Sequence, residues 1–230
     1  MNEIIQHKLT KCIKQRLIGT QYEWQNVIDN IFRICDKNLK TFKPAKIIDI
    51  GCGDGTTTLR LASYFNLNMN NLYGVDYDDA LVTISKQHFN VQKIDLETDD
   101  IPFADNTFDL VICNQVLEHL KHYKKVLDDL IRITNEKGYI IIGIPNLSHL
   151  INRIYLLFGR QPLCIDLDSS HVRSFTHQSF SKMLISLKEV KLLDYNGSLM
   201  YPLPYVLANR IKHHFIGLSG YVCYLLQKLN

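Results

Sequence analysis

The sequence lacks close cysteine pairs and a strong excess of charge. Its six cysteines are spread over 230 residues with no spacing typical of a zinc knuckle or a redox dithiol, so we expect reduced cysteines that pack in a core. The 26 Lys and Arg residues nearly balance the 23 Asp and Glu residues, and the net charge is only +3. Such a mild charge is not the electrostatic footprint of a dedicated nucleic-acid binder.

Long hydrophobic runs are also absent. The apolar stretch Phe215–Leu226 has 12 residues, whereas about 20 are needed to cross a bilayer. The first 17 residues carry charges every few positions, unlike a signal peptide. We therefore expect a cytoplasmic protein without a transmembrane segment. We expect Phe215–Leu226 to pack in the core or in a dimer contact. Because basic and histidine residues precede it, at Arg210, Lys212, His213 and His214, contact with a membrane surface is the alternative.

No repeat or low-complexity segment occurs, but one kind of unit recurs. Short apolar, β-branched runs alternate with helix-length segments that carry apolar residues at three- and four-residue spacings. The expected strands are Lys46–Ile50, Leu72–Val75, Val91–Ile94, Asp109–Cys113 and Tyr139–Ile144, and the expected helices are Thr56–Phe65, Asp79–His88 and Tyr123–Thr134. This alternation predicts an α/β fold with a Rossmann-like, doubly wound, mostly parallel sheet and helices on both faces.

The chain is expected to form a single domain of four parts. Residues 1–45 contain a leading helix with Trp24, Ile28, Ile31, Phe32 and Cys35 at helical spacing, and residues 46–145 form the core. Residues 146–175 are interpreted as a lid over the strand ends, with a helix at Leu147–Gly159 and a loop at Arg160–Ser174. Residues 176–230 supply C-terminal elements: a helix at Thr176–Leu187, a strand at Val190–Tyr195, a turn at Pro202 and Pro204, and a final helical tail.

Charge is distributed unevenly between these parts. The balance is −2 up to Pro145, whereas the nine basic and four acidic residues from Asn146 onward give +5. Arg153, Arg160 and Arg173 fall in the lid region, and a guanidinium is well suited to carboxylate or phosphate. We therefore expect a small, anionic acceptor molecule to meet this part of the chain.

A glycine-rich turn follows the first expected strand in Asp49-Ile50-Gly51-Cys52-Gly53-Asp54-Gly55-Thr56. Three alternate glycines allow a tight turn and a close approach of the backbone to a bound cofactor. The third glycine comes one residue too early for a dinucleotide fingerprint, and no lysine stands near the turn as a phosphate loop requires. The turn therefore indicates a cofactor that is not held through phosphate.

Polar residues follow the next three expected strands. Asp76 stands 21 residues after Gly55, where a carboxylate accepts hydrogen bonds from ribose hydroxyls. Asp95 comes after the third strand, where it either accepts from an exocyclic amine or caps a turn. Asn114 and Gln115 end the fourth strand. Together these residues predict a nucleoside-type ligand at the carboxyl edge of the sheet.

These segments, DIGCGDG, GVDYDD, Asp95-Leu96 and FDLVICNQVLEHL, resemble the successive signatures of class I S-adenosylmethionine-dependent methyltransferases over residues 46–145. The resemblance implies S-adenosylmethionine as cofactor and S-adenosylhomocysteine as product. It places Asp49 and the glycine turn (Gly51, Cys52, Gly53, Gly55) at the methionine portion and Asp76 at the ribose. It also implies that Tyr77, Asp95 and Leu96 lie near adenine and that Asn114 and Gln115 lie near the methyl group.

Candidate acceptor-site residues lie after the fourth strand and in the lid. Gln115, Glu118 and His119 have the spacing of one helix face, and His119 is the preferred general base. His171 is a second catalytic candidate. Glu118, Arg173 and Tyr155 are candidates for contacting substrate.

A comparison within the family concerns a metal. Small-RNA 2′-O-methyltransferases and some ubiquinone-pathway O-methyltransferases bind a divalent ion through Glu-x-x-Glu-His, but Gln115 replaces the first Glu here. We therefore expect no metal, although Glu118, His119 and His171 remain an alternative ligand set.

The segment His171-Val172-Arg173-Ser174-Phe175-Thr176 resembles one in bacterial methyltransferases of surface polysaccharide and lipid modification. The expected function is O-methylation of a sugar or a phosphate or phosphoramidate group in capsule or lipopolysaccharide biosynthesis. Methylation of a lipid, a quinone or tRNA, and a non-catalytic cofactor-binding regulator, are the alternatives. Both a monomer and a homodimer remain open.

Overall fold

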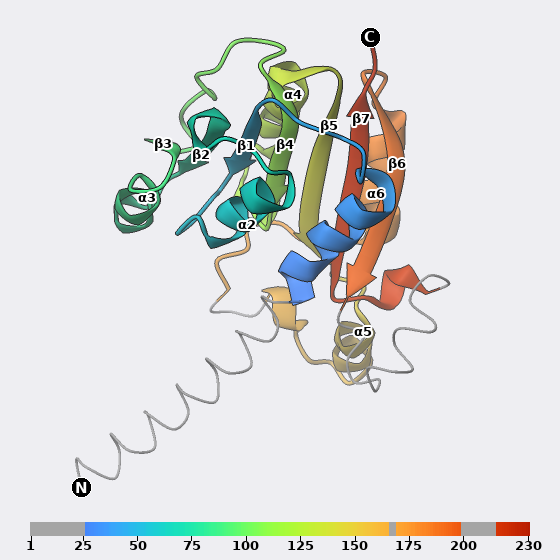
Figure 1. Cartoon of the computed structure of the whole chain (residues 1–230). Helices are drawn as coiled ribbons and strands as arrows, with labels where there is room; N and C mark the ends of the chain where they lie inside the picture. Colours follow the sequence, from blue (N-terminus) through green and yellow to red (C-terminus); the bar gives the residue numbers. More distant parts are fainter. Residues whose placement is uncertain (1–25, 166–168, 199–214) are drawn as a thin grey trace, which may run out of the picture.

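The computed structural model describes residues 26–165, 169–198 and 215–230 (Figure 1). A single seven-stranded sheet has the order β3-β2-β1-β4-β5-β7-β6. The first five strands are parallel to one another. They are β1 (Ile47–Ile50), β2 (Leu72–Asp76), β3 (Asn90–Lys93), β4 (Phe108–Asn114) and β5 (Thr134–Pro145). The strand order turns back between β1 and β4, and ligands of such sheets bind at the carboxyl edge beside that point.

Helices cover both faces of the sheet, as the alternating pattern predicts (Figure 1). They are α2 (Thr56–Tyr64), α3 (Asp79–Ser85), α4 (Tyr123–Ile133), α5 (Leu150–Leu157) and α6 (His177–Ser186). The stripe Leu127, Leu130 and Ile131 of α4 is buried in the core on one face of the sheet. The fold class predicted from the sequence is therefore confirmed.

The leading helix is also confirmed in its described part. Residues 26–38 are helical, and Ile31, Ile34 and Cys35 are buried beside Leu110 of β4 and Leu225 near the C-terminus. Trp24, which was expected on the same face, lies outside the described residues.

The C-terminal segment corrects one prediction. Instead of a helical tail, Tyr221–Lys228 forms strand β7, which pairs antiparallel with β5 on one side and with β6 (Val190–Ser198) on the other. Tyr224, Leu225 and Leu226 are completely buried. The described part of the apolar C-terminal stretch thus packs in the core. The predicted turn at Pro202 and Pro204 and the group Arg210, Lys212, His213 and His214 lie outside the described residues.

The segment after β4 differs from the expected helix. Leu117–His119 forms one short 3₁₀ turn, and α4 begins only at Tyr123. After β5, the chain forms α5 and a short 3₁₀ helix at Leu163–Ile165, both at the carboxyl edge of the parallel strands (Figure 1). Among the described residues, no helix is long and apolar enough to cross a membrane.

Candidate active site

The glycine turn between β1 and α2 has the left-handed backbone that its sequence requires. Gly51, Gly53 and Gly55 have φ of 77°, 56° and 82°. An added Cβ at Gly51 would lie 2.3 Å from Val116 Cγ2, and one at Gly55 would lie 2.7 Å from the Phe89 ring. At Gly53 an added Cβ would meet no atom within 4 Å. Gly51 and Gly55 therefore serve close packing, and Gly53 leaves its space open to a ligand.

Asp76, at the end of β2, fastens this turn to the sheet. Its carboxylate oxygens accept the N–H of Gly53 at 2.8 Å and the N–H of Asp78 at 3.0 Å. The side chain is 8% exposed, and each oxygen keeps a lone pair for a further hydrogen bond. The next residue, Tyr77, is 72% exposed, so its ring is available for stacking. This arrangement fits a ribose and an adenine ring.

Two further residues of the turn point inward. The Cys52 thiol is buried against Gly74, where an added Cβ would lie 2.7 Å from the sulfur, and burial raises the pKa of the Cys52 thiol. Cys52 is thus a packing residue. Asp49 is buried and accepts a hydrogen bond from the Thr58 hydroxyl at 2.5 Å. Burial raises the pKa of the Asp49 carboxyl to about 7, although the Thr58 bond opposes the shift.

Asp49→Asn is expected to stabilise the ligand-free protein in a pH-dependent way. Because the folded-state pKa is raised, the protonated Asp49 stabilises the fold at low pH, and this contribution is lost as the pH rises from about 4 to about 7. The advantage of the variant in free energy of unfolding should grow over that range to at most about 4 kcal/mol, and then level off. Urea unfolding at pH 4.5, 6 and 8 measures it; a pH-independent difference would contradict the assignment.

The ends of β3 and β4 supply the remaining predicted cofactor residues. Asp95 is exposed and accepts the N–H of Glu97 at 3.0 Å, which is the turn cap considered as its alternative role, and Leu96 is buried. Asn114 lies over Gly143 of β5, where an added Cβ would fall 1.9 Å from its Oδ1. Gln115 has a positive φ of 59°, and its side-chain Nε2 is buried without a hydrogen-bond partner in the described structure. That unused donor is available to a ligand.

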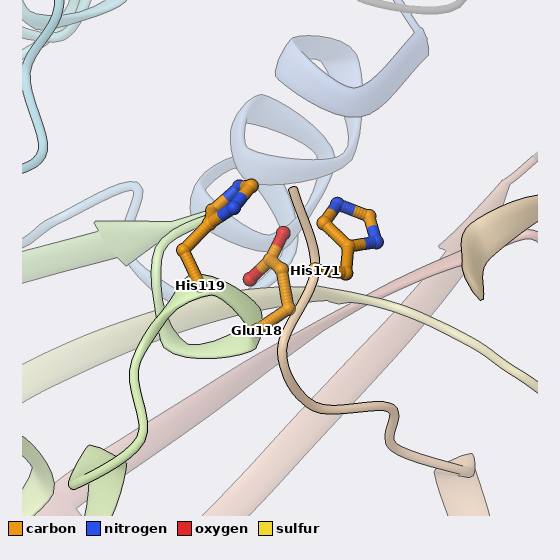
Figure 2. Close-up of side chains that lie close together, drawn as sticks. All are labelled: Glu118, His119 and His171. Carbon is orange, nitrogen blue, oxygen red and sulfur yellow. The ribbon is translucent and has the colours of Figure 1, made fainter. Parts of the chain in front are cut away.

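A second group of side chains lies just beyond β4. Figure 2 shows the Glu118 carboxylate between the imidazole rings of His119 and His171. The ligand atoms of the three residues all lie within 4.8 Å of one another. Val172 and Arg173 donate their N–H groups to the Glu118 carbonyl, both at 3.0 Å, and so join the lid loop to the 3₁₀ turn. The sequence placed Glu118 and His119 on a helix, but this turn and the joined loop position them.

The protonation of these residues reflects burial. Desolvation raises the pKa of Glu118 to about 8. For His119 desolvation lowers the pKa, and the bond to the Ser170 carbonyl partly offsets that effect. A neutral imidazole at His119 near pH 7 is consistent with a proton acceptor.

The lid arginines do not have the predicted arrangement. The Arg173 guanidinium donates to the carbonyls of Leu120 and Lys121 and lies over the Tyr123 ring. Arg153 likewise donates to the Ser148 carbonyl. Both side chains thus satisfy backbone oxygens. Tyr155 lies half-buried on α5, and its contact with an acceptor remains a prediction.

Sequence reasoning missed three partners of the site. Thr58 binds Asp49, the Ser170 carbonyl binds His119, and the Cys164 carbonyl binds His171. Only Thr58 carried a usable signal, because a hydroxyl one helical turn into α2 can reach back to the strand end. The other two partners are backbone oxygens, which residue types do not reveal.

The features of the glycine turn fit S-adenosylmethionine: open space at Gly53, a buried carboxylate at Asp76, an exposed ring at Tyr77 and an unused donor at Gln115. Residues 48–142 match the family model of the methyltransferase domain. An uncharacterized protein of Methanocaldococcus jannaschii is 35% identical over 126 residues, which are 53% of this chain and 51% of that protein. The chain thus spans about half the length of the first curated relatives it matches.

Two further comparisons cover more of the chain. The ubiquinone biosynthesis O-methyltransferase of Coxiella burnetii is 22% identical over 71% of this chain and 70% of its own length. The structure of an S-adenosylmethionine-dependent methyltransferase from Clostridium acetobutylicum aligns with a TM-score of 0.62 at 14% identity, over 97% of this chain and 99% of that one, and so shares the fold. Through residues 48–142, the chain belongs to the class I S-adenosylmethionine-dependent methyltransferase family.

Proposed function

We propose that the protein transfers a methyl group from S-adenosylmethionine to a hydroxyl of a small polar acceptor, such as a sugar of surface-glycan (capsule or lipopolysaccharide) biosynthesis. The carrying observation is the group Glu118, His119 and His171 beside the cofactor turn. Val116, two residues before Glu118, packs against Gly51, since an added Cβ there would lie 2.3 Å from its Cγ2. The proton-accepting group and the cofactor turn are therefore neighbours.

The chain's own residues have two tasks in such a transfer. The bound cofactor supplies a methyl group already activated by a positive sulfur, so positioning and the removal of the hydroxyl proton remain. His119 is the proposed base. The lid loop, held to the 3₁₀ turn through the Glu118 carbonyl, positions His171 across from it. The rings of His119 and His171 lie edge to face with centroids 4.8 Å apart.

The arginine contacts reduce the support for a phosphorylated or phosphoramidate acceptor. Arg153 and Arg173 donate to backbone carbonyls, and Arg160 is exposed at the end of the lid helix. The +5 balance after Pro145 is therefore not gathered into a described anion site. An uncharged sugar hydroxyl is the acceptor we favour.

A quinone or other lipid-like acceptor is the second candidate, because apolar side chains are exposed on the lid helix. Leu156, Leu157 and Phe158 are all more than half exposed at the carboxyl edge. The Coxiella burnetii relative, a ubiquinone biosynthesis O-methyltransferase, adds support for this class. Comparing transfer to a short-chain hydroquinone and to sugar acceptors separates the two candidates.

His119→Ala is expected to lower methyl transfer to the acceptor by about 100-fold or more, the usual contribution of a positioned base. Transfer of tritiated methyl from S-adenosylmethionine to a panel of sugars, nucleotide-linked sugars and short-chain hydroquinones measures it. S-adenosylhomocysteine affinity should stay within about twofold. The exposed His122, three residues away, provides the control variant His122→Ala.

Two results would contradict this function. Unchanged transfer by His119→Ala would exclude the proposed base. S-adenosylhomocysteine binding by the wild type without transfer to any acceptor of the panel would favour the cofactor-binding regulator.

A further inference from the structure

Glu118 has a carboxylate that the described structure leaves without a partner. The residue is 0% exposed, and neither carboxylate oxygen accepts a hydrogen bond from the described residues. The nearby cation, Arg173, directs its donors to the Leu120 and Lys121 carbonyls instead. Burying a carboxylate without a donor or counter-ion is costly, so buried carboxylates are usually paired or bind a metal.

The two neighbouring histidines have the orientation of metal ligands. His171 Nδ1 lies 2.6 Å from the Cys164 carbonyl, and His119 Nδ1 lies 3.3 Å from the Ser170 carbonyl. A carbonyl oxygen only accepts, so each Nδ1 must carry the proton. The lone pair of each ring is then on Nε2, and a backbone contact of this kind holds a metal-binding imidazole in place.

We propose that Glu118, His119 and His171 bind one divalent transition-metal ion. Their ligand atoms lie within 4.8 Å of one another. A metal about 2.0–2.2 Å from each would draw them to about 3.3 Å apart, which small side-chain rotations achieve. The loop contact through the Glu118 carbonyl already holds His171 beside the other two residues.

The donor set favours some metals over others. Two imidazoles and one carboxylate suit Zn²⁺, Co²⁺ or Fe²⁺, whereas Mg²⁺ and Ca²⁺ prefer oxygen ligands. Gln115, with a neutral amide, adds no second negative charge that would favour a hard ion. We therefore expect Zn²⁺ and Co²⁺ to bind much more tightly than Mg²⁺.

Three protein ligands leave a coordination position open. An acceptor hydroxyl at that position would lose its proton more readily, because a bound metal lowers the pKa of an attached oxygen. This role rests on the proposed function, whereas metal binding itself does not.

The test is titration of the untagged, metal-free full chain with Co²⁺, followed by visible absorption and calorimetry. The wild type should bind one ion and develop the absorption bands of a four- or five-coordinate site. Glu118→Gln and His171→Ala should each lose at least 100-fold in affinity, and the control His122→Ala should stay within twofold. Magnesium at millimolar concentration should not compete.

Folding is monitored by S-adenosylhomocysteine affinity, which should be unchanged in the same variants. The proposal is overturned if the wild type binds neither Co²⁺ nor Zn²⁺ at 0.1 mM, if folded Glu118→Gln binds Co²⁺ as the wild type does, or if Mg²⁺ displaces Co²⁺. Metal binding without methyl transfer would count against the proposed function alone. Transfer unaffected by chelator in a chain that binds no metal would count against the metal site alone.

Discussion

Asp76→Ala is expected to weaken S-adenosylhomocysteine binding by about 100-fold or more. The carboxylate is the proposed acceptor for the ribose hydroxyls, and each hydrogen bond to a charged group contributes about 1.5–3 kcal/mol. The same carboxylate holds the Gly53 N–H at 2.8 Å, so its loss also loosens the turn that faces the cofactor. Isothermal titration calorimetry of the folded variant measures the effect.

Asp79→Ala is the matched control for Asp76→Ala. Asp79 stands three residues later in the first turn of α3, where it is exposed and paired with the exposed Lys93. Its replacement should change the affinity less than twofold, because surface ion pairs contribute little. An Asp76→Ala variant that binds within threefold of the wild type would refute the ribose-binding role.

Leu225→Ala is expected to lower the free energy of unfolding by about 2–5 kcal/mol, the usual cost of a cavity in a packed core. Leu225 is 0% exposed in β7 and packs with the core beneath the leading helix. Four residues later, Leu229 is 43% exposed just after the end of β7. Leu229→Ala should therefore change stability by less than about 0.5 kcal/mol. Urea unfolding of both variants provides the comparison.

Equal and small effects of the two leucine substitutions would contradict a buried C-terminal strand. So would a wild-type chain whose C-terminal segment is rapidly cut by protease while the rest stays folded. Either result would return this segment to the surface, where contact with a membrane was the alternative.

The sequence was sufficient for the parallel half of the sheet because its signals are local. Runs such as Ile47–Ile50 are apolar on both faces, and helices with regular apolar spacing lie between them. The C-terminal strand was not predictable in this way. A short apolar run such as Tyr221–Lys228 reads equally as a buried strand or helix, and only its pairing with β5 and β6, far away in the sequence, decides between them.

The cofactor turn and the acceptor group differ in the same respect. The glycines and Asp76 have their required conformations in one short segment, and the structure bears out their proximity. The acceptor group depends on contacts over about 50 residues. Val172 and Arg173 join the Glu118 carbonyl and so bring His171 to His119. Arg173 has a residue type suited to anions, yet carbonyls at the end of a 3₁₀ turn satisfy it equally well.

The most direct test of the central claim is calorimetric titration of the wild-type chain with S-adenosylhomocysteine and, separately, with NAD⁺. A turn open at Gly53 and held by Asp76, with no lysine for phosphate, predicts one S-adenosylhomocysteine bound per chain and no measurable binding of NAD⁺. Tight binding of NAD⁺, or no binding of S-adenosylhomocysteine by the folded protein, would contradict it.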